Sequence, residues 1–381
     1  MDFDFTDEQR LLKDSVESLL SDQYGFTQRK AAAAQPKGWS EPVWKQFADQ
    51  GLLAAPFAEA DGGIGAGPIE TMIIMEALGR ALCLEPYLTS IVVAGGFLRH
   101  GGTDAQRAAY VPSLIDGSKT MAFAQLEKHS RDDLNDVTST AKRTGAGYIL
   151  DGQKYVVWHG DSASTLVVTA RTAGSHRDHK GIGAFLVPAD APGVTVKGYS
   201  TQDSMRAADI SFAGVEVGPD AVIGNPENAL PMIERVVDEA RIALCCEAVG
   251  AMDEALKITV EYLKTRRQFG AAIGSFQALQ HRAADMFVAL EQARGIAMYA
   301  AMATELEPGE RSKAVASAKV QIGRSARFIG QQSVQLHGGI GLTMEARIGH
   351  YFKRLTMIDS TFGDADFHLK RLAALGGPLA A

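Results

Sequence analysis

The sequence predicts an α+β protein of three domains. They are an N-terminal α-helical domain over residues 1–118, a middle antiparallel β sandwich or barrel over residues 119–225, and a C-terminal four-helix bundle over residues 226–381. Two patterns predict this order: apolar residues recur at helical spacing in both outer parts of the chain, and short alternating runs fill the middle. In addition, a chain of 381 residues is too long for a single hydrophobic core.

The first domain reads as helical almost throughout. Thr6 followed by Glu8 and Gln9 resembles a helix N-terminus, and leucines and valines then recur at helical spacing to Leu20. Ser40-Glu41-Pro42 opens a second helix. A glycine-rich loop follows, and further helices are expected over residues 69–79, 90–98 and 104–116.

The middle domain reads as strands. Short apolar and alternating runs are separated by Asp-Gly, Gly-Asp and Pro-Gly pairs, which are typical of turns. Strands without intervening helices favour an antiparallel sandwich or small barrel. The runs are residues 121–124, 147–150, 155–158, 165–169, 183–187 and 210–212.

Helical spacing returns after Gly224-Asn225-Pro226. A long apolar helix is expected first, and three more follow, which is enough for a four-helix bundle. The expected helices cover residues 229–265, 276–306, 312–336 and 364–375.

Composition narrows the class of protein. The chain is 46% hydrophobic and 22% charged with a net charge of −7. It therefore lacks the excess of positive charge that is typical of proteins that bind nucleic acid or an anionic membrane. It lacks an apolar run long enough for membrane insertion, and its acidic start does not resemble a signal peptide. Three cysteines suit buried thiols in a reducing cytosol. We therefore expect a cytoplasmic protein.

One motif at the end of the long helix could bind phosphate. The segment Thr265-Arg266-Arg267-Gln268-Phe269-Gly270 offers guanidinium groups, whose planar fork can bond two oxygens of a pyrophosphate at once. Phe276 and Gln277 follow and could flank an adenine or ribose. The alternative for Arg266 or Arg267 is an ordinary surface charge. The alternatives for Phe276 and Gln277 are core packing and helix capping.

A second motif lies at the end of a later helix. Gln335-Leu336-His337 is followed by Gly338-Gly339-Ile340-Gly341, so successive backbone amides lie open without Cβ cover. A glycine there also serves simply as a helix C-cap. Together the two motifs suggest a site on helices for a dinucleotide that carries a diphosphate.

In combination, these motifs and the α-β-α order resemble the acyl-CoA dehydrogenase superfamily over nearly the whole chain. Asp61-Gly62-Gly63-Ile64-Gly65, Asp151-Gly152-Gln153-Lys154 and Gly341-Leu342-Thr343-Met344-Glu345 carry the resemblance further, and it is nearest to the small subunit of pimeloyl-CoA dehydrogenase. The resemblance implies FAD-dependent α,β-dehydrogenation of an acyl-CoA thioester in fatty acid β-oxidation. The substrate would be medium-chain or dicarboxylic, and the electron acceptor would be electron-transfer flavoprotein.

The resemblance also assigns residues to the cofactor. Arg266, Phe269, Phe276 and Gln277 would bind the diphosphate and adenosine of FAD. Gln335, Gly338 and Gly339 would do the same, commonly for the FAD of a neighbouring subunit. This sharing implies an oligomer, either of identical chains or with a paralogous large subunit.

In the family, a carboxylate removes the α-proton as hydride leaves the β-carbon, and it comes from one of two places. At the first, Asp364 falls at the base position if the downstream Lys370-Arg371-Leu372 is kept in register, and Gly363 falls there if the alignment slides by one. Asp is also a favoured helix N-cap. At the second, Ala240 precedes the matched Arg241, which the resemblance places at the substrate. Glu239 is one residue away, about 100° around the helix, and should point elsewhere.

Glu247 is a third candidate for the base. It lies seven residues after Ala240, about 20° from the same face and roughly 10 Å further along the helix. A carboxylate inside the apolar run of residues 242–249 is costly to bury unless it is paired or functional. The alternative is a salt bridge to another helix of the bundle.

The flavin end departs from the family pattern. The segment of residues 123–128, which contains Leu126, stands where the family usually has a Thr-Glu-Pro stretch, and Trp158 stands at the threonine of the family's Trp-Ile-Thr stretch. Both would lie at the flavin ring, where Trp158 either covers the ring or fills the site. Three interpretations stay open: an acyl-CoA dehydrogenase subunit, an FAD-binding subunit that is catalytically incomplete without a paralogous partner, and a related nitroalkane oxidase or monooxygenase.

Overall fold

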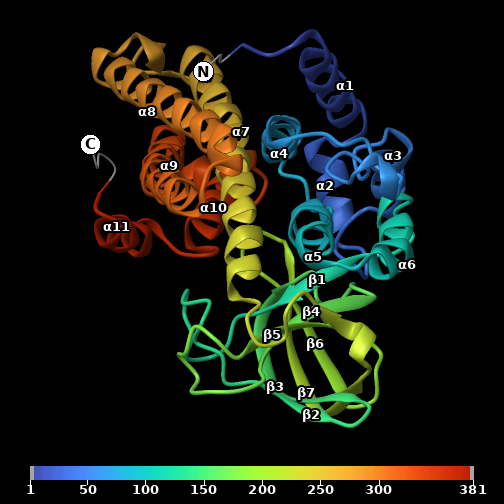
Figure 1. Ribbon diagram of the computed structural model, residues 1–381. Coiled ribbons are helices and arrows are strands. Elements are labelled where there is room, and N and C mark those ends of the chain that lie inside the picture. The colour runs from blue at the N-terminus through green and yellow to red at the C-terminus, as the bar shows by residue number, and fades with distance from the viewer. Residues whose placement is uncertain (1–3, 378–381) are drawn as a thin grey trace. The chain divides into compact units, whose positions relative to one another are not determined.

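A computed structural model describes residues 4–377, and it confirms the predicted fold class of helices, then β-sheet, then helices (Figure 1). The acidic segment Met1–Phe3 lies outside the described residues. The helices are α1 (Asp7–Gln23), α2 (Phe26–Ala33), α3 (Glu41–Asp49), α4 (Pro68–Ala81), α5 (Gly95–Gly101), α6 (Asp104–Ile115), α7 (Leu230–Thr265), α8 (Gln277–Met302), α9 (Pro308–His337), α10 (Arg347–Ser360) and α11 (Ala365–Ala374). A π-helix, Tyr87–Ala94, precedes α5.

By packing, the described chain falls into two compact units. The helical unit comprises residues 4–30, 68–83 and 241–377, and the sheet unit comprises residues 31–67 and 84–240. The division passes through α7. Packing therefore divides the chain differently from the predicted boundaries at residues 118 and 225, which stay a prediction.

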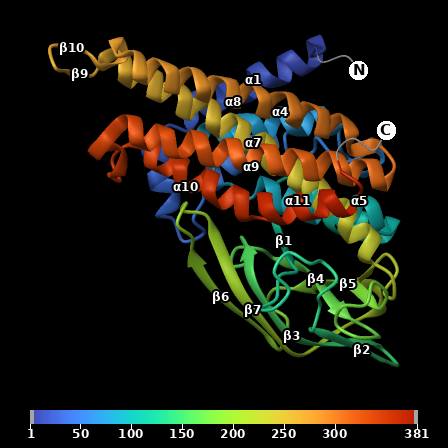
Figure 2. The ribbon, with the colours of Figure 1, turned by 90° about the vertical axis from the view of Figure 1, so that its left-hand side faces the viewer.

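The helical unit is held by a capped first helix and by close packing between its helices. Thr6 and Gln9 form a reciprocal capping box at the start of α1. Where α4 crosses α7, a Cβ at Gly79 would lie 1.9 Å from the backbone oxygen of Glu247, and one at Gly250 would lie 1.8 Å from that of Glu76. Only glycine allows so close a crossing. Further along the chain, α9 packs against α8, α10 and α11 (Figure 2).

The sheet unit is built on one eight-stranded sheet that curls strongly (Figure 1). Most neighbouring strands are antiparallel, as predicted, but β1 pairs with β4 in parallel and so does β2, which makes the sheet mixed. Alternate residues of the strands form its apolar core. The strands are β1 (Met121–Ala124), β2 (Thr140–Thr144), β3 (Gly147–Trp158), β4 (Thr165–Arg171), β5 (Ile182–Pro188), β6 (Val194–Ser200), β7 (Arg206–Val217) and β8 (Val222–Ile223).

Several elements differ from the sequence prediction. The runs at 147–150 and 155–158 are one strand, β3, whose register against β7 shifts at two bulges. The strands β2 and β6 were not predicted, because both are largely exposed and carry few apolar residues. The helices α2 and α10 were also missed, so in the described part of the chain five helices rather than four follow residue 226.

Candidate functional site

The predicted diphosphate motif forms a β-hairpin at the end of α7. The strands β9 (Arg267–Gln268) and β10 (Ala271–Ala272) pair antiparallel, with Gln268 opposite Ala271. The two turn residues, Phe269 and Gly270, have φ of 54° and 79°. Positive φ at both central residues is typical of a type I′ turn, which matches the twist of the strands. The turn thus holds a phenylalanine in a conformation that favours glycine or asparagine.

This hairpin presents apolar surface to solvent. Phe269 is 92% exposed and its ring lies edge-on to that of Phe276, with centroids 6.2 Å apart. Arg266 and Gln277 are also exposed. An aromatic pair beside an exposed guanidinium and an amide can hold an adenine and a phosphate.

The second motif lies at the same end of the helical unit. The rings of Tyr262, one turn before Arg266, and of His337, at the end of α9, stack with centroids 4.4 Å apart. Gly338 caps α9 with φ of 63°, and a Cβ built on Gly338 or Gly339 would meet no atom within 4 Å. The space above both glycines is open. The structure therefore brings the two predicted motifs together and leaves room for a phosphate or ribose beside the second.

Both candidate bases are engaged in the structure. Asp364 is exposed and is the N-cap of α11, and its Oδ1 accepts a hydrogen bond of 2.8 Å from the amide of Phe367. Glu247 is 4% exposed, and its two carboxylate oxygens accept from Nε and Nη2 of Arg354 at 2.5 and 2.8 Å. Each residue therefore has the structural role that the sequence analysis gave as its alternative: Asp364 is a helix N-cap, and Glu247 forms a salt bridge.

Glu239 lies in the sheet unit and is bound there by three basic groups. Its oxygens lie 3.0 Å from Nη2 of Arg99, 2.7 Å from Nε2 of His100 and 2.8 Å from Nε of Arg235. Burial opposes ionisation of this carboxyl, but the hydrogen bond to His100 and the charge of Arg99 outweigh it and lower its pKa to about 2. A carboxylate held this way is a poor proton acceptor.

The loop before α11 is fixed by cationic side chains of the helical unit. Arg241, which is 1% exposed, donates from Nε to the carbonyl of Phe362 at 2.9 Å. Lys319 donates to three backbone carbonyls at 2.9–3.1 Å, those of Ile358, Asp359 and Thr361. Arg241, the predicted substrate residue, thus holds the backbone of the loop that the sequence analysis considered as the location of the base.

His368 fixes the same loop from α11. Its Nε2 lies 3.0 Å from the carbonyl of Phe362, so this nitrogen carries the proton and donates. Burial and the charges of Arg241 and Lys319 lower the pKa of His368 to about 2. The imidazole is therefore neutral at physiological pH.

The predicted flavin residues lie at or just beyond the C-terminal ends of two strands of the sheet unit. Leu126 follows β1, and its carbonyl accepts from the amide of Tyr155 at 2.8 Å. Trp158 ends β3, opposite Ala207, just after a bulge at which Val156 has φ of 49°. Bulges often redirect side chains beside functional sites. Both side chains are half-buried.

The sequence analysis missed a buried ion pair beside Leu126. Lys154 is completely buried, and its Nζ donates to Glu127 Oε1 at 2.7 Å and to Thr169 Oγ1 at 3.1 Å. Burial opposes ionisation of Glu127, but the charge of Lys154 lowers its pKa to about 2. A signal was available, because strand alternation puts Lys154 on the same side of β3 as residues of the apolar core.

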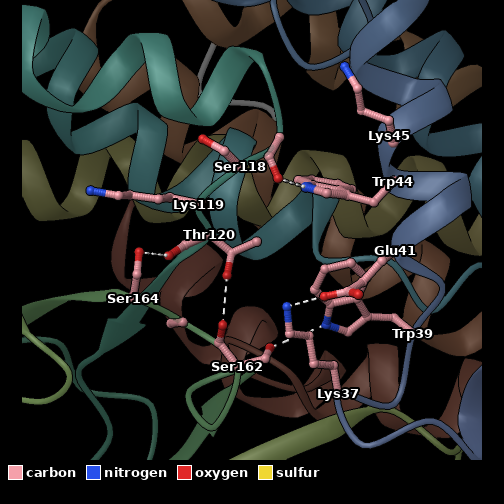
Figure 3. Close-up of a pocket in the computed structure, with 12 residues that line it drawn as sticks. Lys37, Trp39, Glu41, Trp44, Lys45, Ser118, Lys119, Thr120, Ser162 and Ser164 are labelled. Carbon is pink, nitrogen blue, oxygen red and sulfur yellow. Dashed lines mark hydrogen bonds and ion pairs between the residues drawn. The ribbon is translucent and has the colours of Figure 1, made fainter.

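A separate cavity of about 390 Å³ lies within the sheet unit (Figure 3). Its wall includes Trp39, Trp44 and three lysines, but none of the predicted site residues. Several polar groups of the wall bond to each other: Trp39 Nε1 donates to Ser162 Oγ at 3.2 Å, and Thr120 Oγ1 donates to the carbonyl of Ser162 at 2.9 Å. These groups are already satisfied without a ligand.

Comparison with known proteins decides the family. Models of the acyl-CoA dehydrogenase N-terminal, middle and C-terminal domains match residues 6–118, 122–215 and 230–375. The chain belongs to the acyl-CoA dehydrogenase family. Membership confirms the predicted enzyme class, an FAD-dependent acyl-CoA dehydrogenase, and the open glycines and exposed aromatic pair fit the adenosine end of that cofactor.

Relatives of known name span almost the whole chain. A probable acyl-CoA dehydrogenase of Bacillus subtilis, YngJ, is 27% identical over 380 residues, which is 98% of each chain. The acyl-CoA dehydrogenase FadE12 of Mycobacterium tuberculosis is 30% identical over 348 residues, covering 89% of this chain and 88% of FadE12.

Solved structures agree over the same length. A variant of the Tcur3481–Tcur3483 steroid ACAD is 30% identical with a TM-score of 0.87 and covers 97% of each chain. The ChsE4–ChsE5 complex from Mycobacterium tuberculosis is 25% identical with a TM-score of 0.91 and covers all of both chains. In the part of this acyl-CoA dehydrogenase that the structure describes, no helix is long and apolar enough to cross a membrane.

Proposed function

We propose that this acyl-CoA dehydrogenase works as one subunit of a hetero-oligomer, in which a paralogous subunit supplies the base that removes the α-proton. The observation that carries the proposal is that each of the three carboxylates considered as the base has a structural task. Asp364 caps a helix, Glu247 is held by Arg354, and Glu239 is held by three basic groups. A base must be free to approach the α-carbon of the substrate and to accept its proton.

In this proposal the chain provides most of the FAD site. Arg266, Phe269, Phe276 and Gln277 hold the adenosine and diphosphate of one FAD, and Gln335, Gly338 and Gly339 contact the FAD shared with a neighbouring subunit. FAD supplies the acceptor for the hydride that leaves the β-carbon. Leu126 and Trp158 lie beside the flavin ring.

Arg241 acts on the substrate side by holding the carbonyl of Phe362, which keeps the loop before α11 in place. Because Phe362 has φ of 57°, this loop is strained and needs such a clamp. The clamp positions the wall of the acyl site without adding a proton acceptor to it.

The names of two similar structures support the hetero-oligomer, because each names two proteins, ChsE4–ChsE5 and Tcur3481–Tcur3483. We extend the proposal to a medium-chain or dicarboxylic thioester, to electron-transfer flavoprotein as the acceptor, and to a particular likeness to the small subunit of pimeloyl-CoA dehydrogenase. The alternative is that the chain forms a homo-oligomer and is active alone.

The test is to purify the chain alone and together with its nearest co-expressed paralogue. Each preparation is examined for bound FAD by its absorbance spectrum and for bleaching by a panel of acyl-CoA thioesters. We expect bleaching only when the paralogue is present. Bleaching by the chain alone, abolished in Asp364→Asn or Glu247→Gln without loss of folding, would instead identify that residue as the base.

A further inference from the structure

One buried side chain of the sheet unit has a hydrogen-bond donor without an acceptor. Gln125, directly after β1, is 4% exposed, and its Nε2 has no hydrogen-bond partner among the described residues. Buried amide groups in native proteins are almost always satisfied, because an unpaired donor forfeits the bonds that it makes in water. The missing acceptor therefore points to a ligand.

The backbone that carries this side chain is rigid. The carbonyl of Gln125 accepts from Lys154 Nζ at 3.2 Å, and that ammonium is anchored on Glu127. Glu127 in turn accepts from the amides of Thr138 and Ser139 at 2.8 and 3.0 Å. The buried ion pair thus fixes residues 125–127, and the Gln125 amide is positioned before any ligand arrives.

Strand alternation indicates which face of β1 the donor occupies. Ala122 and Ala124 belong to the apolar core of the sheet, whereas the ring of Phe123 packs on that of Phe97 in α5, with centroids 4.8 Å apart. Residues two apart share a face, so Gln125 continues the face of Phe123.

We propose that Gln125 Nε2 donates a hydrogen bond to an oxygen atom of the bound acyl group, so that the protein selects thioesters whose acyl chain carries a carbonyl, hydroxyl or carboxylate oxygen. This inference rests on the proposed function. The surroundings favour a specific polar contact, since Phe97 and Phe123 make the face otherwise apolar. A site that holds one fixed donor discriminates strongly against an analogue that lacks the acceptor, because the donor then stays unpaired.

The test measures binding rather than turnover. The co-purified complex is titrated with pairs of acyl-CoA thioesters of equal length that differ in one oxygen-bearing group, such as hexanoyl-CoA against adipoyl-CoA, and against the 5-oxo and 5-hydroxy analogues of hexanoyl-CoA. Dissociation constants come from calorimetry. We expect at least one oxygen-bearing member to bind about tenfold more tightly than the plain chain, a ratio typical of one buried hydrogen bond.

Three variants complete the test. Gln125→Leu removes the donor and should reduce the preference to about twofold or less while FAD stays bound. Gln125→Glu keeps the size but replaces the donor with an acceptor, so it should lose the preference even if the leucine variant folds poorly. Gln202→Leu, at an exposed position in a turn of the same unit, should leave the preference unchanged.

Each outcome bears on the proposal. Equal binding within every pair by the unmodified complex, or a preference that survives both Gln125 variants, overturns it. Loss of FAD in both variants with the preference intact assigns the donor to the cofactor and also overturns it. If no thioester binds at all, the proposed function itself fails, whereas equal binding of the pairs refutes only the role of Gln125.

Discussion

The ion pair between Glu247 and Arg354 gives the sharpest stability prediction. Both residues are 4% exposed, and two hydrogen bonds of 2.5 and 2.8 Å join their side chains. Glu247→Gln keeps the shape but removes the negative charge that faces the buried guanidinium of Arg354. Breaking one partner of a buried pair costs about 3–5 kcal/mol, far more than loss of a surface pair.

The assay is urea unfolding followed by helical circular dichroism. We expect the free energy of unfolding of the Glu247→Gln variant to fall by about 3–5 kcal/mol with little change in the dependence on urea concentration. The control replaces both members, Glu247→Met with Arg354→Met. Two apolar side chains of similar size leave no buried charge, so most of the lost stability should return.

Two results would refute this reasoning. A loss of less than about 1 kcal/mol in the Glu247→Gln variant would mean that the pair behaves like an exposed one. Full stability together with a complete loss of flavin reduction would mean that Glu247 serves the chemistry rather than the bundle. The second result would also count against a base supplied by a partner subunit.

Three further predictions concern other parts of the molecule. Gly250→Ala forces α4 and α7 apart and should cost at least about 3 kcal/mol by urea unfolding, whereas Gly295→Ala on the open surface of α8 should stabilise by about 0.5–1 kcal/mol. The depressed pKa of Glu239 stabilises the fold above pH 4.5, and this contribution of about 3 kcal/mol should fade as the pH falls toward 2, but not in a Glu239→Gln variant. Phe269→Asn relieves a positive φ, so the melting temperature should hold or rise while the FAD content of the purified protein falls; unchanged FAD content would argue against a cofactor contact.

Strong periodicity made most of the fold readable from the sequence. The two long helices α7 and α9 and the buried strands β4 and β5 carry continuous apolar patterns, and all four were predicted. The helix α10 was missed although Ile348, Tyr351, Leu355 and Ile358 recur at helical spacing, because the polar and charged residues between them dilute the pattern. The parallel pairing of β1 with β4 depends on contacts between distant segments, which alternation does not encode.

The candidate site was readable only in part. The spacing of the two glycines and the arginine segment predicted a nucleotide site, because such motifs act through local backbone geometry. Whether a carboxylate is a base or half of an ion pair depends on a partner far along the chain. Arg354 lies 107 residues after Glu247, and no local sequence pattern predicts that these two residues pair.

The crossing of α4 and α7 has a consequence for synthesis on the ribosome. Since α4 ends at Ala81 and its glycine-mediated contact lies near Glu247, roughly 160 residues must be added, which takes about 10–30 s at ordinary translation rates. During that interval the apolar residues of α4, which include Met72, Ile73 and Met75, cannot yet be buried by packing of α4 against α7. The nascent chain thus exposes an aggregation-prone apolar helix until the C-terminal part of the chain has been synthesised. A chaperone would therefore protect the chain most at this stage.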